Sequence, residues 1–189
     1  EVPETKELDL IAAENGGAAL AWSDEHYGVP SNIIVRRRGI NMGDGWETAR
    51  KLNRPPAYEA DSAGNLVLPD MSDWAVFSLG HAGRLTEIEV DTQHFKGNFP
   101  ESCMIEGALA SRSGIDWSDA GEAAGVKWVP LVPRSEGKLT ASASHLYAVD
   151  GAGPFSHIRL TIYPDGGVMR LRVRGTIDRA AEAGLVAAA

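Results

Sequence analysis

The fold of this chain is decided by residues 156–173, SHIRLTIYPDGGVMRLRV, in which apolar and polar side chains alternate on both sides of a turn signal. The apolar positions are Ile158, Leu160 and Ile162 before the turn, and Met169, Leu171 and Val173 after it. Alternation with a period of two is typical of β-strands that bury one face. The turn signal, PDGG at 164–167, combines a proline that fixes φ with glycines that tolerate positive φ. The segment therefore predicts an antiparallel hairpin of two strands.

Several other segments carry shorter versions of this pattern. Residues 86–91 and 139–145 alternate apolar or small side chains with polar ones. Three short apolar runs, at 18–22, 33–35 and 74–79, are bounded by Gly, Asp, Asn or Pro. Strands separated by irregular loops favour an antiparallel sheet, because parallel strands need helical crossovers. We therefore expect an all-β fold, an antiparallel sandwich.

A short amphipathic helix is expected near the start of the chain. Leu8, Ile11 and Ala12 recur at helical spacing within residues 4–14. Asn-Gly-Gly at 15–17 follows and supplies a helix stop.

The remaining segments set the expected domain organisation. The length of 189 residues and the hydrophobic content of 43% suit one sizeable core and exclude a disordered chain. Residues 53–71 are rich in Pro, Asp, Gly and Asn and predict a long surface loop. Residues 178–189 are rich in alanine and predict a terminal helix or a frayed end. We expect one domain over residues 1–177, followed by this tail.

Composition also excludes several classes of function. The formal net charge of −8 argues against binding to nucleic acids or anionic membranes, which requires a basic face. No run approaches the roughly 20 apolar residues of a transmembrane helix, and the acidic residues 1–9 do not resemble a signal peptide. Cys103 is the single cysteine, so an internal disulfide and a thiolate metal cluster are both excluded. We expect a cytoplasmic protein.

Two polar loops hold candidate functional groups. Ser-Asp-Glu-His at 23–26 follows a predicted strand and offers two carboxylates and an imidazole for acid–base chemistry. A solvated turn capped by its own side chains is the alternative. Residues 44–50 place Glu47 and Arg50 in a loop where glycines flank Asp44 and permit an unusual backbone path. A tight loop with a buried Trp46 is the alternative there.

The loop richest in polar groups is residues 91–103, DTQHFKGNFPESC, which follows a strand. It contains Asp, His, Lys, Asn and Glu and is interrupted by Gly and Pro. Loops held by a rigid sheet concentrate binding groups. Glu106 follows on the next apolar run. An ordinary polar crossing between strands explains the same composition. Cys103 lies next to Met104 and Ile105, which favours a buried, inert thiol over a nucleophile.

Histidine and arginine supply the last candidates. His157 and Arg159 share one face of a predicted strand, and His145 ends another. Arginine presents a planar fork that suits a carboxylate, although a polar outer face is the ordinary state of an antiparallel sheet. The three arginines at 36–38 predict a solvated rim. The five histidines show no i, i+4 spacing of the kind that binds a metal, so we predict no metal and no cofactor.

Four segments together resemble the allantoicase family, also called allantoate amidinohydrolases. They are NMGDGWETAR at 41–50, EVDTQHFKGNFPESC at 89–103, FSHIRLTIYPDGGVMRLRVRG at 155–175 and SDEHYG-x-P-x-N at 23–32. Their order and combination are highly specific, and the resemblance covers residues 8–175.

The resemblance carries several implications. The family typically has two homologous repeats in a longer chain, and the motifs here resemble the second, C-terminal repeat. The family fold is a galactose-binding-like jelly roll. Its reaction is the hydrolysis of allantoate to ureidoglycolate and urea in purine catabolism. A homo-oligomer and contact with the first repeat are also implied.

The chemistry of allantoate suggests roles for the polar residues. The substrate has one carboxylate and two ureido groups on a single carbon, so a site needs a cation, hydrogen-bonding groups and an acid–base pair. Arg159 or Arg50 suits the carboxylate, and Asn98 and Thr92 suit the ureido groups. The candidate catalytic residues are Glu47, Asp91, His94 and Glu106. The candidate substrate-binding residues are Asp24, Glu25, His26, Arg50, Thr92, Asn98, His157 and Arg159.

Loops from the same end of a jelly roll converge, so residues 23–26 and 91–106 are expected to meet. We predict that His94, Asn98 and Glu47 share a cleft there with Asp24 or Glu25 and with an arginine nearby.

Two other functions remain open at this point. One is a non-catalytic jelly-roll module that binds a small molecule or a carbohydrate, since fold alone does not decide function. The other is a structural half that completes an oligomeric enzyme.

Overall fold

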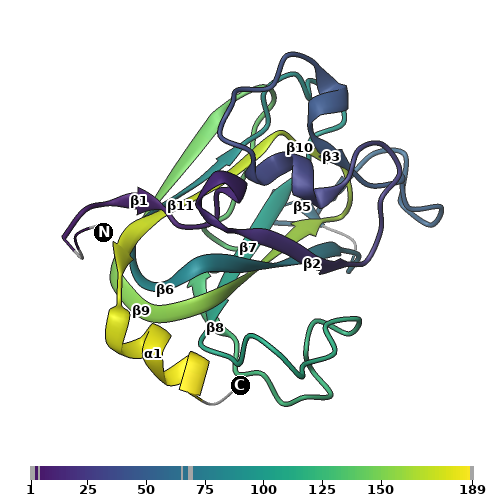
Figure 1. The fold of residues 1–189 in the computed structure, drawn as a ribbon. Helices are drawn as coiled ribbons and strands as arrows, with labels where there is room; N and C mark the ends of the chain where they lie inside the picture. Colours follow the sequence, from purple (N-terminus) through teal and green to yellow (C-terminus); the bar gives the residue numbers. More distant parts are fainter. Residues whose placement is uncertain (1–2, 4, 65, 68–69, 188–189) are drawn as a thin grey trace.

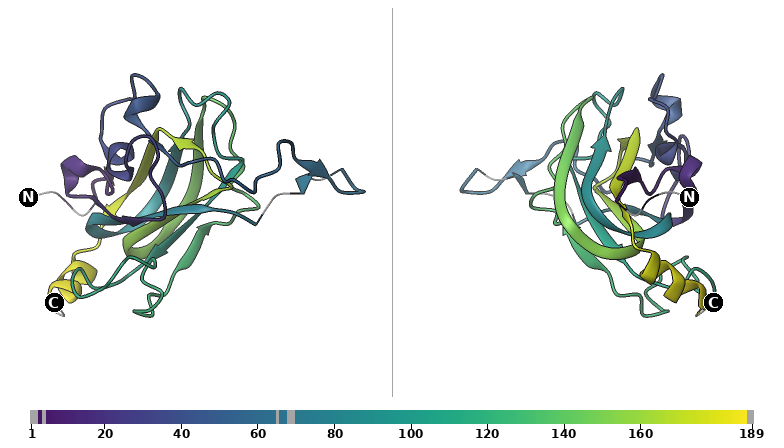
Figure 2. Two further views of the ribbon diagram at one scale, coloured as in Figure 1. Left: turned by 90° about the vertical axis from the view of Figure 1, so that its right-hand side faces the viewer. Right: turned by 60° about the vertical axis from the view of Figure 1, so that its left-hand side comes forward.

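Two long antiparallel strands, β6 (Asp73–Asp91) and β9 (Ser144–Tyr163), form the centre of the computed structural model (Figure 1). The structure describes residues 3, 5–64, 66–67 and 70–187. Both strands are strongly bent (Figure 2). Their pairing register shifts three times between Ser78 and Glu87 of β6, so the bend coincides with irregular pairing.

The bend lets each long strand serve both layers of the sandwich. The first part of β6 pairs with β2 (Ala18–Trp22) on one side and with the end of β9 on the other. The last part of β6 pairs with β11 (Arg170–Ile177) and with the start of β9. Gly83 lies at the bend, where a Cβ atom would approach the carbonyl oxygen of Thr176 to 2.5 Å. A residue with a side chain would therefore push the paired strands β6 and β11 apart at this point.

Shorter elements complete the sheet and the loop end of the sandwich. The order of the main sheet is β1-β11-β6-β9-β7-β8, with β2 also paired to β6, and every pairing between described strands is antiparallel. The other strands are β1 (Leu8–Asp9), β3 (Trp46–Glu47), β4 (Glu59–Ala60), β5 (Leu66–Val67), β7 (Ser102–Ala108), β8 (Val129–Val132) and β10 (Gly167–Val168). The helices are the 3₁₀ turns η1 (Ala13–Asn15), η2 (Pro30–Ile34) and η3 (Met42–Asp44), and the α-helix α1 (Arg179–Ala187).

The core confirms the faces predicted from alternation. The side chains of Ile158, Leu160 and Ile162 on β9 and of Leu171 and Val173 on β11 are fully buried. Ile88 and Val90 of β6 are fully buried beside them. The all-β antiparallel sandwich is thus confirmed, and its inner faces are those that the period of two indicated.

The predicted hairpin is wrong in its pairing, although both strands exist. β9 and β11 do not pair with each other, because β6 lies between them and pairs antiparallel with both. The two strands therefore run in the same direction, and the PDGG segment crosses between layers instead of reversing the chain. Alternation determines which face of a strand is buried, but it carries no information about the neighbouring strand.

The predicted helix over residues 4–14 is also wrong; residue 4 lies outside the described residues. Leu8 and Asp9 instead add a short strand to the edge of β11. The next three side chains, Leu10, Ile11 and Ala12, are all buried. Three consecutive buried residues do not fit one face of a helix, and contact with the sandwich outweighs the weak helical spacing.

Two predicted strands and one loop also differ from the structure. Residues 33–35 do not form a strand, because Pro30 starts the 3₁₀ turn η2. Residues 139–143 form a loop, since the Thr92 hydroxyl donates to the carbonyl oxygen of Thr140 at 2.6 Å and holds it away from the sheet. The predicted loop at 53–71, whose residues 65 and 68–69 lie outside the described residues, forms an arm that carries β4 and β5 and projects from the sandwich (Figure 2).

The described part of the tail is helical. Asp178 accepts a hydrogen bond from the Ala181 amide at 3.0 Å and caps α1. Glu182 forms two hydrogen bonds with the Arg112 guanidinium, at 2.7 and 2.8 Å, which ties the helix to a loop of the sandwich. No helix of the described residues is long and apolar enough to cross a membrane. A domain boundary at residue 177 stays a prediction.

Candidate functional site

The structure divides the candidate residues among three places. The first place is called the loop-end cluster: the hydrogen-bonded pair of Glu47 and Asn98 at β3, with Asp24, whose carbonyl oxygen accepts from the neighbouring Trp46, and His94, which belongs to the same loop as Asn98. Glu47 Oε1 accepts a hydrogen bond of 2.6 Å from Asn98 Nδ2. Glu47 is half-buried and belongs to β3, so its backbone is fixed by pairing with Gly167 of β10.

Local sequence explains how Glu47 is held. The preceding Trp46 is fully buried, and its indole N–H donates to the carbonyl oxygen of Asp24 at 2.9 Å. On the other side, the Glu47 backbone exchanges hydrogen bonds of 2.8 and 3.0 Å with Tyr27. Trp46 therefore anchors the 44–50 loop to the 23–26 loop, and Glu47 beside it reaches Asn98 of the 91–103 loop.

Asn98 is positioned by the crossing segment between β9 and β11. Its carbonyl oxygen accepts a hydrogen bond from the Gly167 amide at 2.8 Å. Gly166 has a φ of +131°, and a Cβ atom there would lie 2.6 Å from the same oxygen. Only glycine fits this conformation and this space, so the PDGG segment serves the loop-end cluster.

The side chains of His94 and Asp24 are each held by a backbone group of another loop. His94 has a φ of +71°, and its Nε2 lies 3.1 Å from the carbonyl oxygen of Gly39. A carbonyl oxygen can only accept, so Nε2 carries the hydrogen and Nδ1 is left for proton exchange. The Asp24 carboxylate accepts a 2.7 Å hydrogen bond from the Ala49 amide.

Other predicted members of this site lie at its edge. Glu25 and His26 are exposed, and the His26 ring packs edge-on against Tyr27 with centroids 4.4 Å apart. The Arg50 side chain is exposed, and its guanidinium lies 3.5 Å from the carbonyl oxygen of Pro55. Tyr27, which sequence reasoning missed, is 62% exposed beside Glu47.

The second place, the arginine groove, contains Asp91. This groove of about 120 Å³ is lined by Arg36, Arg38, Glu89, Asp91, Arg170, Arg172 and Arg174. Burial raises the pKa of the Asp91 carboxyl, and the nearby negative charge of Glu89 adds to this effect. The sequence interpretation placed the arginines at 36–38 in a solvated rim and did not predict this groove. The concentration of arginine at 36–38 and 170–174 in an acidic chain is the sequence signal that could have indicated it.

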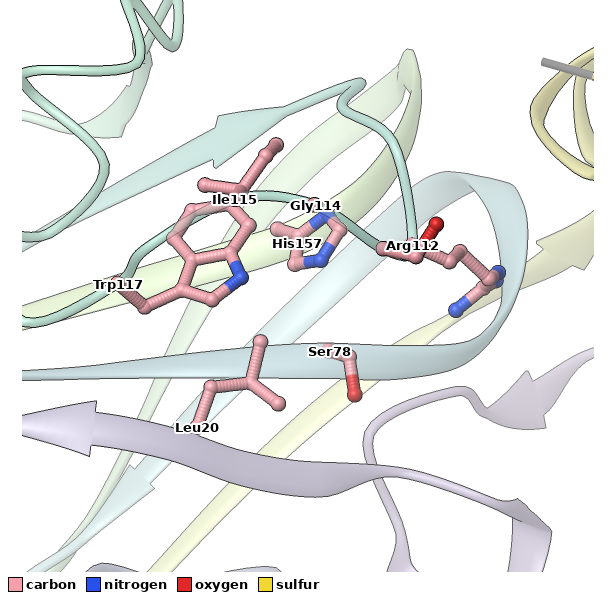
Figure 3. A pocket seen from close by; sticks show the side chains of 8 residues that line it. Leu20, Ser78, Arg112, Gly114, Ile115, Trp117 and His157 are labelled. Carbon is pink, nitrogen blue, oxygen red and sulfur yellow. The ribbon is translucent and has the colours of Figure 1, made fainter. Parts of the chain in front are cut away.

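The third place, the outer-face cleft, lies over β6 and β9 and has a volume of about 420 Å³. Figure 3 shows Trp117 and His157 on one side of this cleft and Leu20 and Ser78 on the other. His157 is only 1% exposed, because the loop that carries Trp117 covers the strand and stacks the indole on the imidazole at 4.5 Å. The expected solvated face is therefore wrong at His157.

The electrostatics of His157 follow from this cover. Burial, assisted by the positive charge of Arg112, lowers the pKa of the His157 imidazole to about 4. Its Nδ1 lies 2.8 Å from the Ser156 hydroxyl. His157 is thus neutral at physiological pH.

Arg159 and Glu106 form a closed pair close to this cleft. Two guanidinium nitrogens of Arg159 lie 2.7 Å from one carboxylate oxygen of Glu106, and both side chains are largely buried. The Arg159 guanidinium also lies 4.9 Å from the Trp128 ring centroid. Arg159, one of the two arginines expected to bind a substrate carboxylate, is therefore already engaged by protein groups.

Three remaining observations limit the chemistry. Thr92 is fully buried, and its hydroxyl is engaged with the loop at 140–143, so it is a structural residue. Burial raises the pKa of the Cys103 thiol to about 12, which removes it as a nucleophile. Among the described residues, no group of three His, Cys, Asp or Glu side chains is placed to hold a metal ion.

Comparisons with known proteins agree with this architecture. The family model of the allantoicase repeat matches residues 8–178. A probable allantoicase of Pseudomonas syringae pv. tomato is 47% identical over 181 residues, which are 95% of this chain and 48% of the relative. The chain thus spans about half the length of the curated relatives it matches.

Solved structures extend the comparison. The crystal structure of allantoicase from Saccharomyces cerevisiae matches 89% of this chain and 43% of its own, with a TM-score of 0.69 and 36% identity. A family 32 carbohydrate-binding module from Clostridium perfringens, solved in complex with galactose, covers 89% of this chain and 99% of its own, with a TM-score of 0.53 and 16% identity. The latter likeness concerns the fold alone.

Proposed function

Because this chain belongs to the allantoicase family, we propose that it forms one repeat of an enzyme that hydrolyses allantoate to ureidoglycolate and urea. The loop-end cluster is the proposed catalytic site. The observation that carries this assignment is the 2.6 Å hydrogen bond between Glu47 and Asn98, which orients a half-buried carboxylate at the loop end. The C-terminal position of the repeat is part of the proposal.

The proposed reaction needs one proton taken and one proton given. Glu47 accepts a proton from water, whose oxygen attacks the carbon that bears the two ureido groups. The bond from that carbon to one ureido nitrogen breaks, and a proton delivered to this nitrogen releases urea. His94 suits the delivery in its imidazolium form, in which Nε2–H stays on the Gly39 carbonyl oxygen and Nδ1–H gives its proton to the departing nitrogen. The proton that Glu47 took from water then returns to Nδ1 through solvent.

The arginine that would anchor the substrate carboxylate is Arg50 in this proposal. Arg159 is paired with Glu106, whereas Arg50 is exposed and lies three residues after Glu47 in the sequence. Arg50 can turn toward a ligand without breaking an ion pair recorded among the described residues.

A binding half without catalysis is the second candidate, and the exposure of Tyr27 favours it. An exposed aromatic ring beside Glu47 offers a contact surface for a ligand or for the other repeat. We also propose that the repeat works in a homo-oligomer beside its partner repeat, in the cytoplasm. The free, buried thiol of Cys103 agrees with a reducing compartment.

The deciding experiment measures urea release from allantoate by this chain alone and by the two-repeat enzyme. In the two-repeat enzyme, Glu47→Gln is expected to lower turnover by about 10²–10⁴-fold, because it removes the general base. Glu136→Gln, an exposed change outside the three places, is the matched control. Normal turnover of the Glu47→Gln enzyme would assign catalysis to the other repeat and leave this one as the binding half.

A further inference from the structure

The arginine groove lies on the outer face of β11, opposite the core. Leu171 and Val173 point inward and are fully buried, so Arg170, Arg172 and Arg174 point outward by the alternation of the strand. The segment between η2 and η3 lies across this face, because Arg170 and Arg172 of β11 both donate to its carbonyl oxygens.

Two of these arginines hold that segment in place. Arg172 donates to the carbonyl oxygens of Val35 and Arg36 at 2.6 and 2.9 Å. Arg170 donates through Nε to the carbonyl oxygen of Arg37 at 2.6 Å and through Nη1 to that of Asp44 at 2.8 Å. The groove is therefore bounded on one side by the strands β6 and β11 and on the other by residues 35–44, which hydrogen bonds hold against β11.

One donor in this groove has no acceptor. Arg170 is 2% exposed, and its buried Nη2 has no hydrogen-bond partner among the described residues. A buried N–H group of a charged side chain is costly to leave unpaired, and such groups normally find a partner. The missing partner must be an acceptor, since a guanidinium can only donate.

The charges around the groove favour an anion as that acceptor. Arg174 is already paired with Glu87 and Glu89, and Arg172 lies 3.7 Å from Asp9. The remaining positive charges of the lining are Arg36, Arg38 and Arg170, and Asp91 is the carboxylate of the lining that faces them. Glu14 also acts on Arg36, and Asp44 on Arg170, from outside the lining. Asp91 Oδ1 accepts from the Gln93 amide at 2.7 Å, so its charge is partly used within its own loop.

We propose that the arginine groove binds a small oxyanion, a carboxylate or a phosphate, which accepts from Arg170 Nη2 and is attracted by Arg38. The groove has a volume of about 120 Å³ and a lining made entirely of charged side chains, which suits a small anion such as a single carboxylate or phosphate group. The site is separate from the proposed hydrolytic function and does not rest on it.

Substitution of Asp91 should change the affinity for an anion in the opposite direction to substitution of an arginine. A bound anion is repelled by the Asp91 carboxylate and attracted by the guanidinium groups. Asp91→Asn keeps an oxygen for the Gln93 amide and removes the repulsion, so it strengthens binding. Arg38→Gln removes one attraction from an exposed position that does not fasten the segment, so it weakens binding without unfolding the groove.

The test is isothermal titration of this chain at low salt with inorganic phosphate, acetate and allantoate in separate experiments. Arg38→Gln is expected to weaken binding about fivefold, because one attracting charge at the rim of the groove is lost. Asp91→Asn is expected to tighten binding severalfold, and Lys127→Gln is the control that removes an exposed positive charge elsewhere. Each anion that binds should also raise the thermal midpoint of the chain, and this shift should shrink in Arg38→Gln.

The three ligands distinguish the source of the anion. Binding of phosphate alone identifies a phosphate site, and binding of acetate and allantoate identifies a carboxylate site. The proposal is overturned if none of the three binds at millimolar concentration, if Arg38→Gln binds as tightly as the unmodified chain, or if Asp91→Asn binds more weakly.

Discussion

The loop-end cluster and the outer-face cleft contain the same types of side chain but differ in what holds them. At the outer-face cleft, His157 is covered by Trp117, and close to it Glu106 is paired with Arg159. In the loop-end cluster, Glu47 is oriented by the neutral amide of Asn98 and remains half-buried. The Glu106 carboxylate is thus engaged by a fixed positive charge, whereas the Glu47 carboxylate is oriented by a neutral partner. Residue type therefore does not identify a catalytic group unless its partner is known.

The largest expected effect tests this comparison with the two histidines. His94→Ala in the two-repeat enzyme should lower turnover by about 10²–10⁴-fold, because a proton donor is lost. His157→Phe should keep turnover within a fewfold of normal, since the imidazole is buried under Trp117. Steady-state kinetics of urea release checks both. If His157→Phe were the more damaging change, the outer-face cleft would be the catalytic site.

The second effect is on stability. Here the substitution of Glu106 should be more damaging than that of Glu47, the reverse of the order expected for turnover. Glu106→Ala leaves the Arg159 guanidinium largely buried without its partner and should cost about 3–5 kcal/mol of unfolding free energy. Glu47→Ala removes a half-buried carboxylate whose partner is neutral and should cost about 1 kcal/mol. Urea denaturation of the chain measures both values. Equal losses of unfolding free energy would contradict the distinction between the ion-paired Glu106 and the amide-held Glu47.

The third effect is a pH dependence that belongs to the outer-face cleft. The pKa of His157 is about 4 in the folded chain and about 6.5 in the unfolded chain, so between these values the unfolded chain binds more protons. Stability is therefore full above pH 6.5 and falls as the pH is lowered toward 4, with a loss of about 2 kcal/mol at pH 5. His157→Phe should lack this part of the loss. Denaturation at pH 7.5 and pH 5 compares the two chains, and an unchanged pH slope in the variant would show that His157 is not buried as neutral imidazole.

The smallest effect concerns Tyr27 at the loop-end cluster. Tyr27→Ala removes an exposed ring that contributes to substrate contact but moves no proton. KM for allantoate should rise about threefold to tenfold while kcat is retained, since only binding shared by ground state and transition state is lost. A fall in kcat with an unchanged KM would contradict this role.

The candidate site was only partly predictable from the chain. Asp24, Glu47 and Asn98 fall in loops that punctuation by Gly and Pro marks clearly, and these loops do meet. Asp91 and Glu106 fall within or next to the same loop, yet they face the arginine groove and Arg159 instead. Successive side chains of a strand point to opposite faces, so nearness in sequence does not place two residues in one site.

The sequence by itself determined the faces of the strands, because a period of two reports which side chains leave water. It therefore specified the buried residues of β9 and β11 and the antiparallel sandwich. Tertiary structure alone decided that β6 lies between these strands, that Trp117 covers His157, and that the segment at 36–38 turns an outer face into a groove. These are contacts between segments far apart in the chain, and they depend on backbone pairing and on the space left by other elements, neither of which leaves a periodic trace in the residues concerned.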